Sequence, residues 1–181
     1  MSWTTPRTWT PGETVTASIM NTHVRDNLID LNGRIPYSIG AYAYRTTAQS
    51  ISSASWATMS WSTTAYDTDS LWSVGSPTRL TVPTGKGGLW QIQWNVRWNI
   101  ITVNNVRIMS WPVVNATAQT AWMTENSTST SQYQTSGATV NYNLSAGDYI
   151  EIQVYQDTGA AVNIRASENF FGLYYLGPAL T

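Results

Sequence analysis

The stretch LWQIQWNVRWNI, residues 89–100, alternates apolar and polar side chains along its whole length. One set of alternate positions holds Trp90, Ile92, Trp94, Val96, Trp98 and Ile100, and the other holds Gln91, Gln93, Asn95, Arg97 and Asn99. Because successive side chains of a β-strand point to opposite faces, this period of two predicts a strand with one buried face. Three indoles on that face predict a core built around large aromatic side chains.

The same period of two runs through most of the chain from residue 41 onward. Asn104 and Asn105 form a candidate turn, and the segment LSAGD (144–148) leads into the alternating run YIEIQVYQ (149–156). The segment FFGLYYLG (170–177) reads as the last strand. Short strands separated by turn signals, without a second helix, predict an all-β sandwich or jelly roll.

An extended arm and one short helix are expected before this sandwich. Apolar residues recur at helical spacing at Ala17, Met20, Val24, Leu28, Leu31 and Ile35. Thr16 is a candidate N-cap, Gly33 a candidate C-cap, and Pro36 prevents continuation. We therefore divide the chain into an extended anchoring arm (1–15), a helix (16–36) and a jelly-roll head (37–181). A short helix with one apolar stripe must pack against its own domain or against copies of itself.

Composition narrows the functional classes. The 181 residues include no cysteine, which excludes disulfides, thiolate metal sites and a thiol nucleophile. Only 10% are charged and the net charge is -1, so a basic stripe for nucleic acid is not expected. We also expect no membrane insertion and no classical export signal, because no long apolar run occurs. Such a weakly charged surface favours oligomerisation.

The order of strand markers resembles the jelly roll of tumour necrosis factor and the complement globular heads. The markers are Leu80, Val82, Pro83, Gly85 and Trp90, then the turn at Leu144, Gly147 and Asp148, then Phe171, Gly172 and Leu173. Two features depart from the family pattern: Leu80 stands where an aromatic residue is usual, and residues 86–88 lengthen the glycine turn. The resemblance implies a homotrimer with an aromatic seam on one sheet. We expect the Trp90 face to fill the core, and Tyr149, Tyr155, Tyr174 and Tyr175 to form the seam.

The N-terminal segment WTTPRTWTPGETVTASIMNTHVRDNLIDL resembles the opening of small tailed-bacteriophage virion proteins. The matching positions are Trp9, Gly12, Glu13, Val15, Thr16, Ala17, Met20, Asn21, Val24, Arg25, Asp26, Asn27 and Leu28. This resemblance implies a virion structural protein whose partners are phage capsid or tail proteins. Trp3, Trp9, Pro11 and Glu13 then become candidates for particle anchoring. The stripe of Met20, Val24, Leu28 and Leu31 becomes the candidate trimer helix.

Candidate catalytic and metal sites have simpler interpretations. His23, the single histidine, could form an axial metal or anion site in a trimer, but a polar position at the edge of the stripe is commoner. Asp67 and Asp69 offer fewer carboxylates than a calcium loop. Nothing pairs Glu125, Glu151, Asp157 and Glu168 as glycosidase carboxylates. We expect no enzyme, no metal site and no cofactor.

Exposed tryptophans form the main alternative site, because indole faces stack on sugar C–H patches. Core packing is the default for Trp90, Trp94 and Trp98, whereas Trp56, Trp61, Trp72, Trp111 and Trp122 lie near loops or strand ends. Trp56, Trp72 and Trp122 are our candidates for contact with host-surface glycans.

These observations predict a virion-located homotrimer that serves as a fibre or tail-tip component. Two alternatives remain open at this stage: a decoration protein at threefold positions of the capsid, and a free glycan-binding module.

Overall fold

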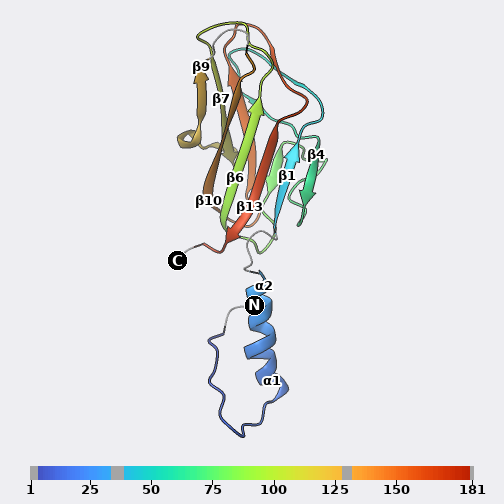
Figure 1. Cartoon of the computed structure of the whole chain (residues 1–181), viewed down its shortest axis with the longest axis vertical. Coiled ribbons are helices and arrows are strands. Elements are labelled where there is room, and N and C mark those ends of the chain that lie inside the picture. The colour runs from blue at the N-terminus through green and yellow to red at the C-terminus, as the bar shows by residue number, and fades with distance from the viewer. Residues whose placement is uncertain (1–3, 34–38, 128–131, 180–181) are drawn as a thin grey trace. The chain divides into compact units, whose positions relative to one another are not determined.

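The computed structural model describes residues 4–33, 39–127 and 132–179. It divides the chain into two compact units, residues 1–36 and 37–181. In the first unit, an extended segment precedes one continuous helical run (Figure 1), made of α1 (Ala17–Met20), the π-helical turn η1 (Asn21–Arg25) and α2 (Asp26–Gly33). Thr16 is extended and its Oγ1 accepts the Ile19 N–H at 3.3 Å, which confirms the predicted N-cap. Residues 34–36 of the expected helix lie outside the described residues.

The second unit is a sandwich of antiparallel strands. Its elements are β1 (Gly40–Tyr44), β2 (Gln49–Ile51), β3 (Ala57–Thr58), β4 (Thr63–Asp67), β5 (Arg79–Thr81), β6 (Gly88–Arg97), β7 (Arg107–Val114), β8 (Thr117–Ala118), the 3-10 turn η2 (Thr120–Trp122), β9 (Thr124–Ser127), β10 (Thr135–Leu144), β11 (Tyr149–Gln156), β12 (Val162–Ile164) and β13 (Phe170–Gly177).

Two sheets face each other across the core. Sheet I has the strand order β10-β6-β13-β1-β4, and Figure 1 shows β6 and β13 at its centre. Sheet II has the order β3-β11-β7-β8, with β5 also paired to β11 and β9 to β7. The short strands β12 and β2 pair separately. The fold class predicted from the sequence, a jelly roll preceded by an arm and a short helix, is confirmed.

Strand β6 explains why the chain places indoles on alternate positions. Trp90, Trp94 and Trp98 are each at most 2% exposed and point into the core between the sheets. A buried indole N–H needs a partner, and each of the three has one. Trp94 Nε1 donates to Ser110 Oγ of β7 at 2.9 Å, Trp90 Nε1 to the Lys86 carbonyl at 3.0 Å, and Trp98 Nε1 to Ser136 Oγ at 3.4 Å. The Trp94 bond joins sheet I to sheet II.

The last position of the predicted strand is wrong. Ile100 was expected to share the buried face, but β6 ends at Arg97 and Ile100 is 46% exposed. Trp98 makes only an isolated bridge to Ile164, and the alternation breaks there. Ile101 takes the buried position instead, at 1% exposure.

Candidate functional site

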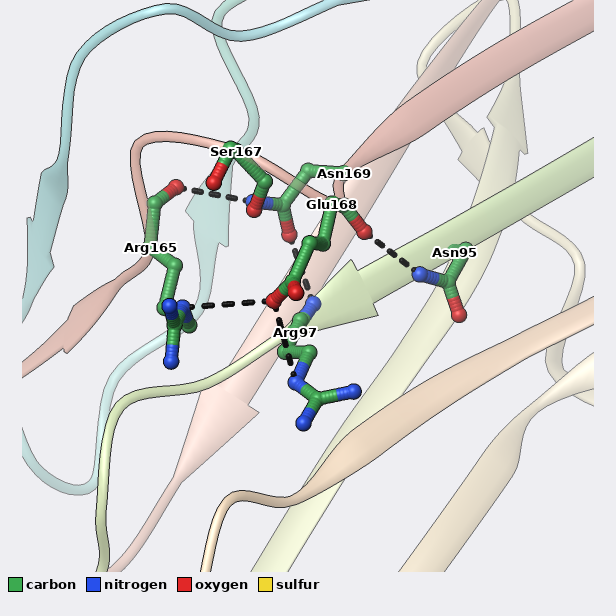
Figure 2. Close-up of polar contacts among 6 residues, drawn as sticks. All are labelled: Asn95, Arg97, Arg165, Ser167, Glu168 and Asn169. Carbon is green, nitrogen blue, oxygen red and sulfur yellow. Dashed lines mark hydrogen bonds and ion pairs between the residues drawn. The ribbon is translucent and has the colours of Figure 1, made fainter.

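A polar cluster lies where β6 ends and β13 begins (Figure 2). Asn169 is 2% exposed, and its side-chain oxygen accepts the Arg97 backbone N–H at 2.6 Å. Its amide donates to the backbone carbonyls of Arg165 at 2.8 Å and Ser167 at 2.9 Å. Because this buried amide is fully bonded, it fixes the turn that presents Glu168. Glu168 itself has a positive φ of 70°.

Glu168 is shared by two arginines. Its Oε2 lies 3.2 Å from Arg97 Nε and 3.3 Å from Arg165 Nε, as Figure 2 shows. The guanidinium carbons of these arginines lie 5.4 Å and 4.3 Å from the ring centroid of Tyr133. All three charged side chains are about a third to a half exposed, so each ion pair contributes at most about 1 kcal/mol. The cluster can hold the β12–β13 turn and, with one net positive charge, can attract an anionic group.

A row of aromatic side chains covers the outward face of sheet I, and we call it the tyrosine face: Tyr42, Tyr66, Phe170 and Tyr174. Tyr42 lies between Phe170, at a ring-centroid distance of 5.1 Å, and Tyr66, at 6.3 Å. Tyr66 lies 6.3 Å from Tyr174. Gly172 makes room for this row, because a Cβ there would meet Cε2 of the Tyr174 ring at 2.6 Å. The strands thus align four rings across β4, β1 and β13.

The tyrosine face is poor in charge except at its Phe170 end, where Arg45 and Glu168 line a hollow together with Tyr42 and Phe170. Within the described strands of sheet I, the outward positions beside the rings carry amides and hydroxyls: Gln91, Gln93, Asn95, Thr139 and Asn141. Burial, followed by a hydrogen bond with Tyr66, raises the pKa of Tyr174 far above its ordinary value. Burial likewise raises the pKa of Tyr42. A hollow of about 550 Å³ lies at this face, lined in part by Tyr66, Tyr174 and Gln91.

Sheet II carries a different surface, which we call the tryptophan platform: Trp56, Trp111 and Tyr155. Trp56 directly precedes β3, which pairs with β11, so its ring reaches Tyr155 at 4.8 Å between centroids. Its ring also lies 3.6 Å from that of Trp111 on β7, with 30° between the planes. Trp111 is 8% exposed, whereas Trp56 is 41% exposed. Trp56 therefore covers Trp111 and leaves much of its own surface to solvent.

An ion pair borders the platform. Asp157 accepts the Arg107 backbone N–H at 2.6 Å and Arg107 Nε at 2.8 Å. Burial acts to raise the pKa of Asp157, but the hydrogen bonds and charge of Arg107 outweigh it, and the net pKa is lowered. The Arg107 guanidinium lies 5.8 Å from the centroid of Tyr155. The carboxylate holds the arginine at the edge of the aromatic rings.

The first unit has its own contacts around the predicted anchoring residues. Glu13 pairs with Arg7, and the Arg7 guanidinium lies 4.9 Å from the Trp9 ring. A hydrogen bond from the Thr10 backbone lowers the pKa of Glu13. Asn27 fastens the arm to the helix, since its side chain exchanges two 2.9 Å hydrogen bonds with the Thr4 backbone. Pro11 and Gly12 form the intervening turn, and Trp3 lies outside the described residues.

The predicted trimer helix presents an uncovered stripe. Met20 is 44% exposed, Val24 37%, Leu28 59% and Leu31 51%. An amphipathic helix normally buries such a stripe, so these side chains are available to a partner.

The four tyrosines predicted to form a seam do not share a surface. Tyr174 belongs to the tyrosine face, whereas Tyr175 is 5% exposed and packs against Trp90 at 5.1 Å between ring centroids. Tyr149 and Tyr155 lie on β11 of sheet II, and Tyr149 packs under the Arg79 guanidinium at 4.7 Å. Neighbouring residues in a strand face opposite ways, and β11 belongs to the other sheet, so one seam cannot contain all four. The prediction is corrected accordingly.

Sequence reasoning missed Tyr42, Tyr66 and Phe170. A signal was present in the segment GAYAY (40–44), where Tyr42 and Tyr44 alternate with buried alanines. That alternation marks an outward aromatic face.

The three tryptophans predicted to contact glycans differ in how much of the side chain is exposed to solvent. Trp72 and Trp122 are partly buried and pack against the core; Trp72 Nε1 donates to the Pro77 carbonyl at 3.4 Å, and Trp122 lies edge-on to Tyr142 at 4.8 Å. Of the three, Trp56 has the most exposed side chain, at 41%. It stands in the platform with Trp111, which the sequence had placed only near a strand end.

Four of the acidic residues weighed for catalysis or calcium have structural partners: Asp67, Glu151, Asp157 and Glu168. The Asp67 carboxylate accepts the backbone N–H groups of Leu71 and Trp72 at 2.8 and 2.9 Å. Glu151 accepts the Thr78 hydroxyl at 2.5 Å. Among the described residues, no cluster of three His, Asp or Glu side chains could hold a metal ion. In the same part of the chain, no helix has the length and apolar character needed to cross a membrane.

Comparison with known proteins identifies the fold. No protein-family model and no curated protein matches the chain. The solved structure of Eiger TNF from S. frugiperda matches at TM-score 0.56 and 17% identity, over 79% of this chain and 95% of that one. Two murine APRIL structures, at pH 8.5 and pH 5.0, match at TM-scores 0.52 and 0.54 and 13% identity, over 76% of this chain and 98% of theirs. At such identities the likeness establishes the fold alone, and that fold is a tumour-necrosis-factor-like jelly roll.

Proposed function

We propose that the chain is a non-enzymatic structural protein of a tailed-bacteriophage virion, assembled as a homotrimer on the particle surface. A tumour-necrosis-factor-like fold is compatible with a non-enzymatic binding or structural role. The proposed location in the virion is supported by the N-terminal pattern from Trp9 to Leu28, which resembles that of tailed-phage virion proteins. The trimer rests on the tyrosine face, and this is the observation that carries the proposal.

The tyrosine face has the chemistry of an interface core. Interfaces between subunits are depleted in charge at their centre and enriched in tyrosine, tryptophan and phenylalanine. On sheet I four aligned rings stand among amides and hydroxyls, and Tyr66 remains 45% exposed in the single chain. A second copy supplies apolar surface for the rings and hydrogen-bond partners for the amides. The resemblance to tumour necrosis factor implies that three copies meet through such a face.

The helix adds a second contact to the same assembly. Three copies of the stripe from Met20 to Leu31 would bury one another in a short bundle, which removes the cost of leaving these side chains in water. The arm, with Trp9 and Glu13, then remains as the attachment to capsid or tail proteins. Large aromatic side chains of this kind contribute a disproportionate share of interface energy.

Between the two particle locations, we favour a fibre or tail-tip component over a capsid decoration protein. The tryptophan platform lies on sheet II, away from the proposed trimer face, and it offers an exposed aromatic ring to an external partner. A decoration protein needs a grip on the shell and does not need such a ring. Removing the protein from particles should reduce adsorption to cells in the first case, and should lower the heat tolerance of filled heads in the second.

The trimer is tested by mass and by two matched charge substitutions. The wild-type protein should sediment at about three times its 20.0 kDa chain mass. Tyr66→Asp, which places a charge in the proposed seam, should yield smaller species. Tyr133→Asp is the control, because Tyr133 is equally exposed (43% against 45%) but lies beside two arginines at the polar cluster. A monomeric wild type, or a Tyr66→Asp protein of unchanged mass, contradicts the proposed seam.

The helix is tested separately with Val24→Asp. This substitution places a charge within the exposed stripe and should weaken assembly without unfolding the head. Unchanged association at dilute protein concentration would mean that the stripe packs elsewhere.

A further inference from the structure

The tryptophan platform has an arrangement that packing alone does not require. Trp111 sits on β7 with its Nε1 donating to Gln153 Oε1 at 3.3 Å, and Trp56 lies over its ring at 3.6 Å between centroids. Trp56 is therefore supported from below by Trp111 and from the side by Tyr155. At 41% exposure it presents a broad apolar surface to solvent that nothing else in the described chain covers. A smaller aliphatic side chain would cover Trp111 with less apolar surface in water.

Polar groups surround this surface in fixed positions. Asp157 orients Arg107 through two hydrogen bonds, at 2.6 and 2.8 Å, and both involve the backbone N–H or Nε. The Arg107 guanidinium carries two terminal nitrogens besides the Nε that Asp157 holds, and that side chain is 55% exposed. The amide nitrogen of Gln153 also remains available, since only its oxygen is used by Trp111. The platform thus combines a supported indole with oriented hydrogen-bond donors.

The charge balance narrows the ligand class. Asp157 pairs with Arg107, and the carboxylate of Glu125 on β9 also interacts with this arginine, so the platform has no uncompensated cation to select a phosphate or carboxylate. An acyl chain would need a larger apolar groove without polar groups at its edge. A hexopyranose fits both features, because its C–H face packs on an indole while its hydroxyls accept and donate hydrogen bonds at the rim.

We infer that the tryptophan platform is a carbohydrate-binding site, in which Trp56 stacks on a neutral or N-acetylated hexopyranose and Arg107 and Gln153 bond its hydroxyl or carbonyl groups. The inference rests on the proposed function in one respect, namely that the head is displayed on the particle surface toward the host cell. The chemistry is carried by the platform itself and does not depend on the trimer. A glycan on the bacterial surface is the ligand class that matches this chemistry.

The test uses the full-length protein on an array of neutral, N-acetylated and acidic oligosaccharides, followed by calorimetric titration with the best neutral probe. Trp56→Ala should weaken binding at least about tenfold, as expected when a central stacked ring is removed. Tyr133→Ala is the matched control, because Tyr133 is an aromatic side chain of similar exposure (43%) in the head but lies outside the platform. Trp56→Phe keeps a ring over Trp111 and should retain part of the affinity. Circular dichroism and sedimentation of each variant report folding and assembly.

Each outcome bears on one proposal. Loss of binding in Trp56→Ala with unchanged mass and spectrum supports the site, and it does so whether the protein is trimeric or monomeric. A wild type that binds none of the neutral or N-acetylated probes overturns it. So does binding confined to acidic probes, or equal binding by the wild type and Trp56→Ala. A monomeric protein that still binds through Trp56 would remove the proposed trimer and leave the carbohydrate site standing.

Discussion

The hydrogen bond between Trp94 and Ser110 should make a measurable contribution to the stability of the sandwich. It joins the central strand of sheet I to β7 of sheet II at 2.9 Å, between two side chains that are at most 2% exposed. Ser110 Oγ also lies 2.9 Å from Thr124 Oγ1, and Thr124 keeps a second acceptor in the Ser110 carbonyl at 3.2 Å. Removing the serine hydroxyl therefore leaves the indole N–H as the group without a partner.

These contacts set the expected cost of each substitution in free energy of unfolding. Ser110→Ala should destabilise the fold by about 1–3 kcal/mol, the cost of an unsatisfied buried donor. Trp94→Phe should cost roughly 2–3 kcal/mol, from the lost hydrogen bond and the space left by the smaller ring. In the double variant neither the donor nor its acceptor remains. Its cost should therefore be smaller than the sum of the two single costs by about 1 kcal/mol or more.

Urea unfolding followed by far-ultraviolet circular dichroism measures these free energies, at one protein concentration because oligomerisation shifts apparent stability. The Trp98–Ser136 pair provides a control within the same protein, since it also joins a buried indole, directly after β6, to a serine but at 3.4 Å. Its cycle should show a coupling below about 0.5 kcal/mol, because so long a hydrogen bond is weak. Additive costs at Trp94 and Ser110, or equal couplings in the two cycles, would refute the reasoning.

Two further predictions concern the tyrosine face and the arm. Because the folded-state pKa of Tyr174 is raised, the stability it contributes is present below the ordinary tyrosine pKa of about 10 and is lost as pH rises beyond it. Urea midpoints measured from pH 8 to pH 11.5 should fall less steeply for Tyr174→Phe than for the wild type, and parallel curves would contradict this. Deleting residues 1–13 should leave a folded head that no longer joins the particle, measured by its recovery in purified virions; normal incorporation would argue against the anchoring arm.

The regular elements could be predicted because their signals are local. The alternation in residues 89–97 reappears as the burial pattern of β6, and YIEIQVYQ and FFGLYYLG coincide with β11 and β13. Thr16 caps the helix as its sequence context indicated. Period and capping depend on residues within a few positions of each other, so a single sequence contains them.

The candidate surfaces could not be predicted because they depend on strand pairing. Tyr66 and Tyr174 are 108 positions apart and meet only because β4 and β13 both pair with β1. Trp56 and Trp111 meet only because β3 and β7 both pair with β11. Alternation indicates that Tyr174 and Tyr175 face opposite ways, but it does not say which of them is buried.

The two outer faces differ in charge, and this difference favours sheet I over sheet II as the proposed seam. If sheet II formed the seam, the Arg107–Asp157 pair at its surface would lose water on both partners, and a buried ion pair rarely recovers that desolvation cost. Arg79 and Glu151, which are neighbours across β5 and β11, would lose water as well. On sheet I, the ion pairs of Glu168 with Arg97 and Arg165 lie at the end of β6, whereas the positions from Gln91 to Asn95 beside the rings carry no charge. The rings themselves gain by leaving water. The seam is therefore expected on sheet I, which leaves the platform on sheet II free to meet a ligand.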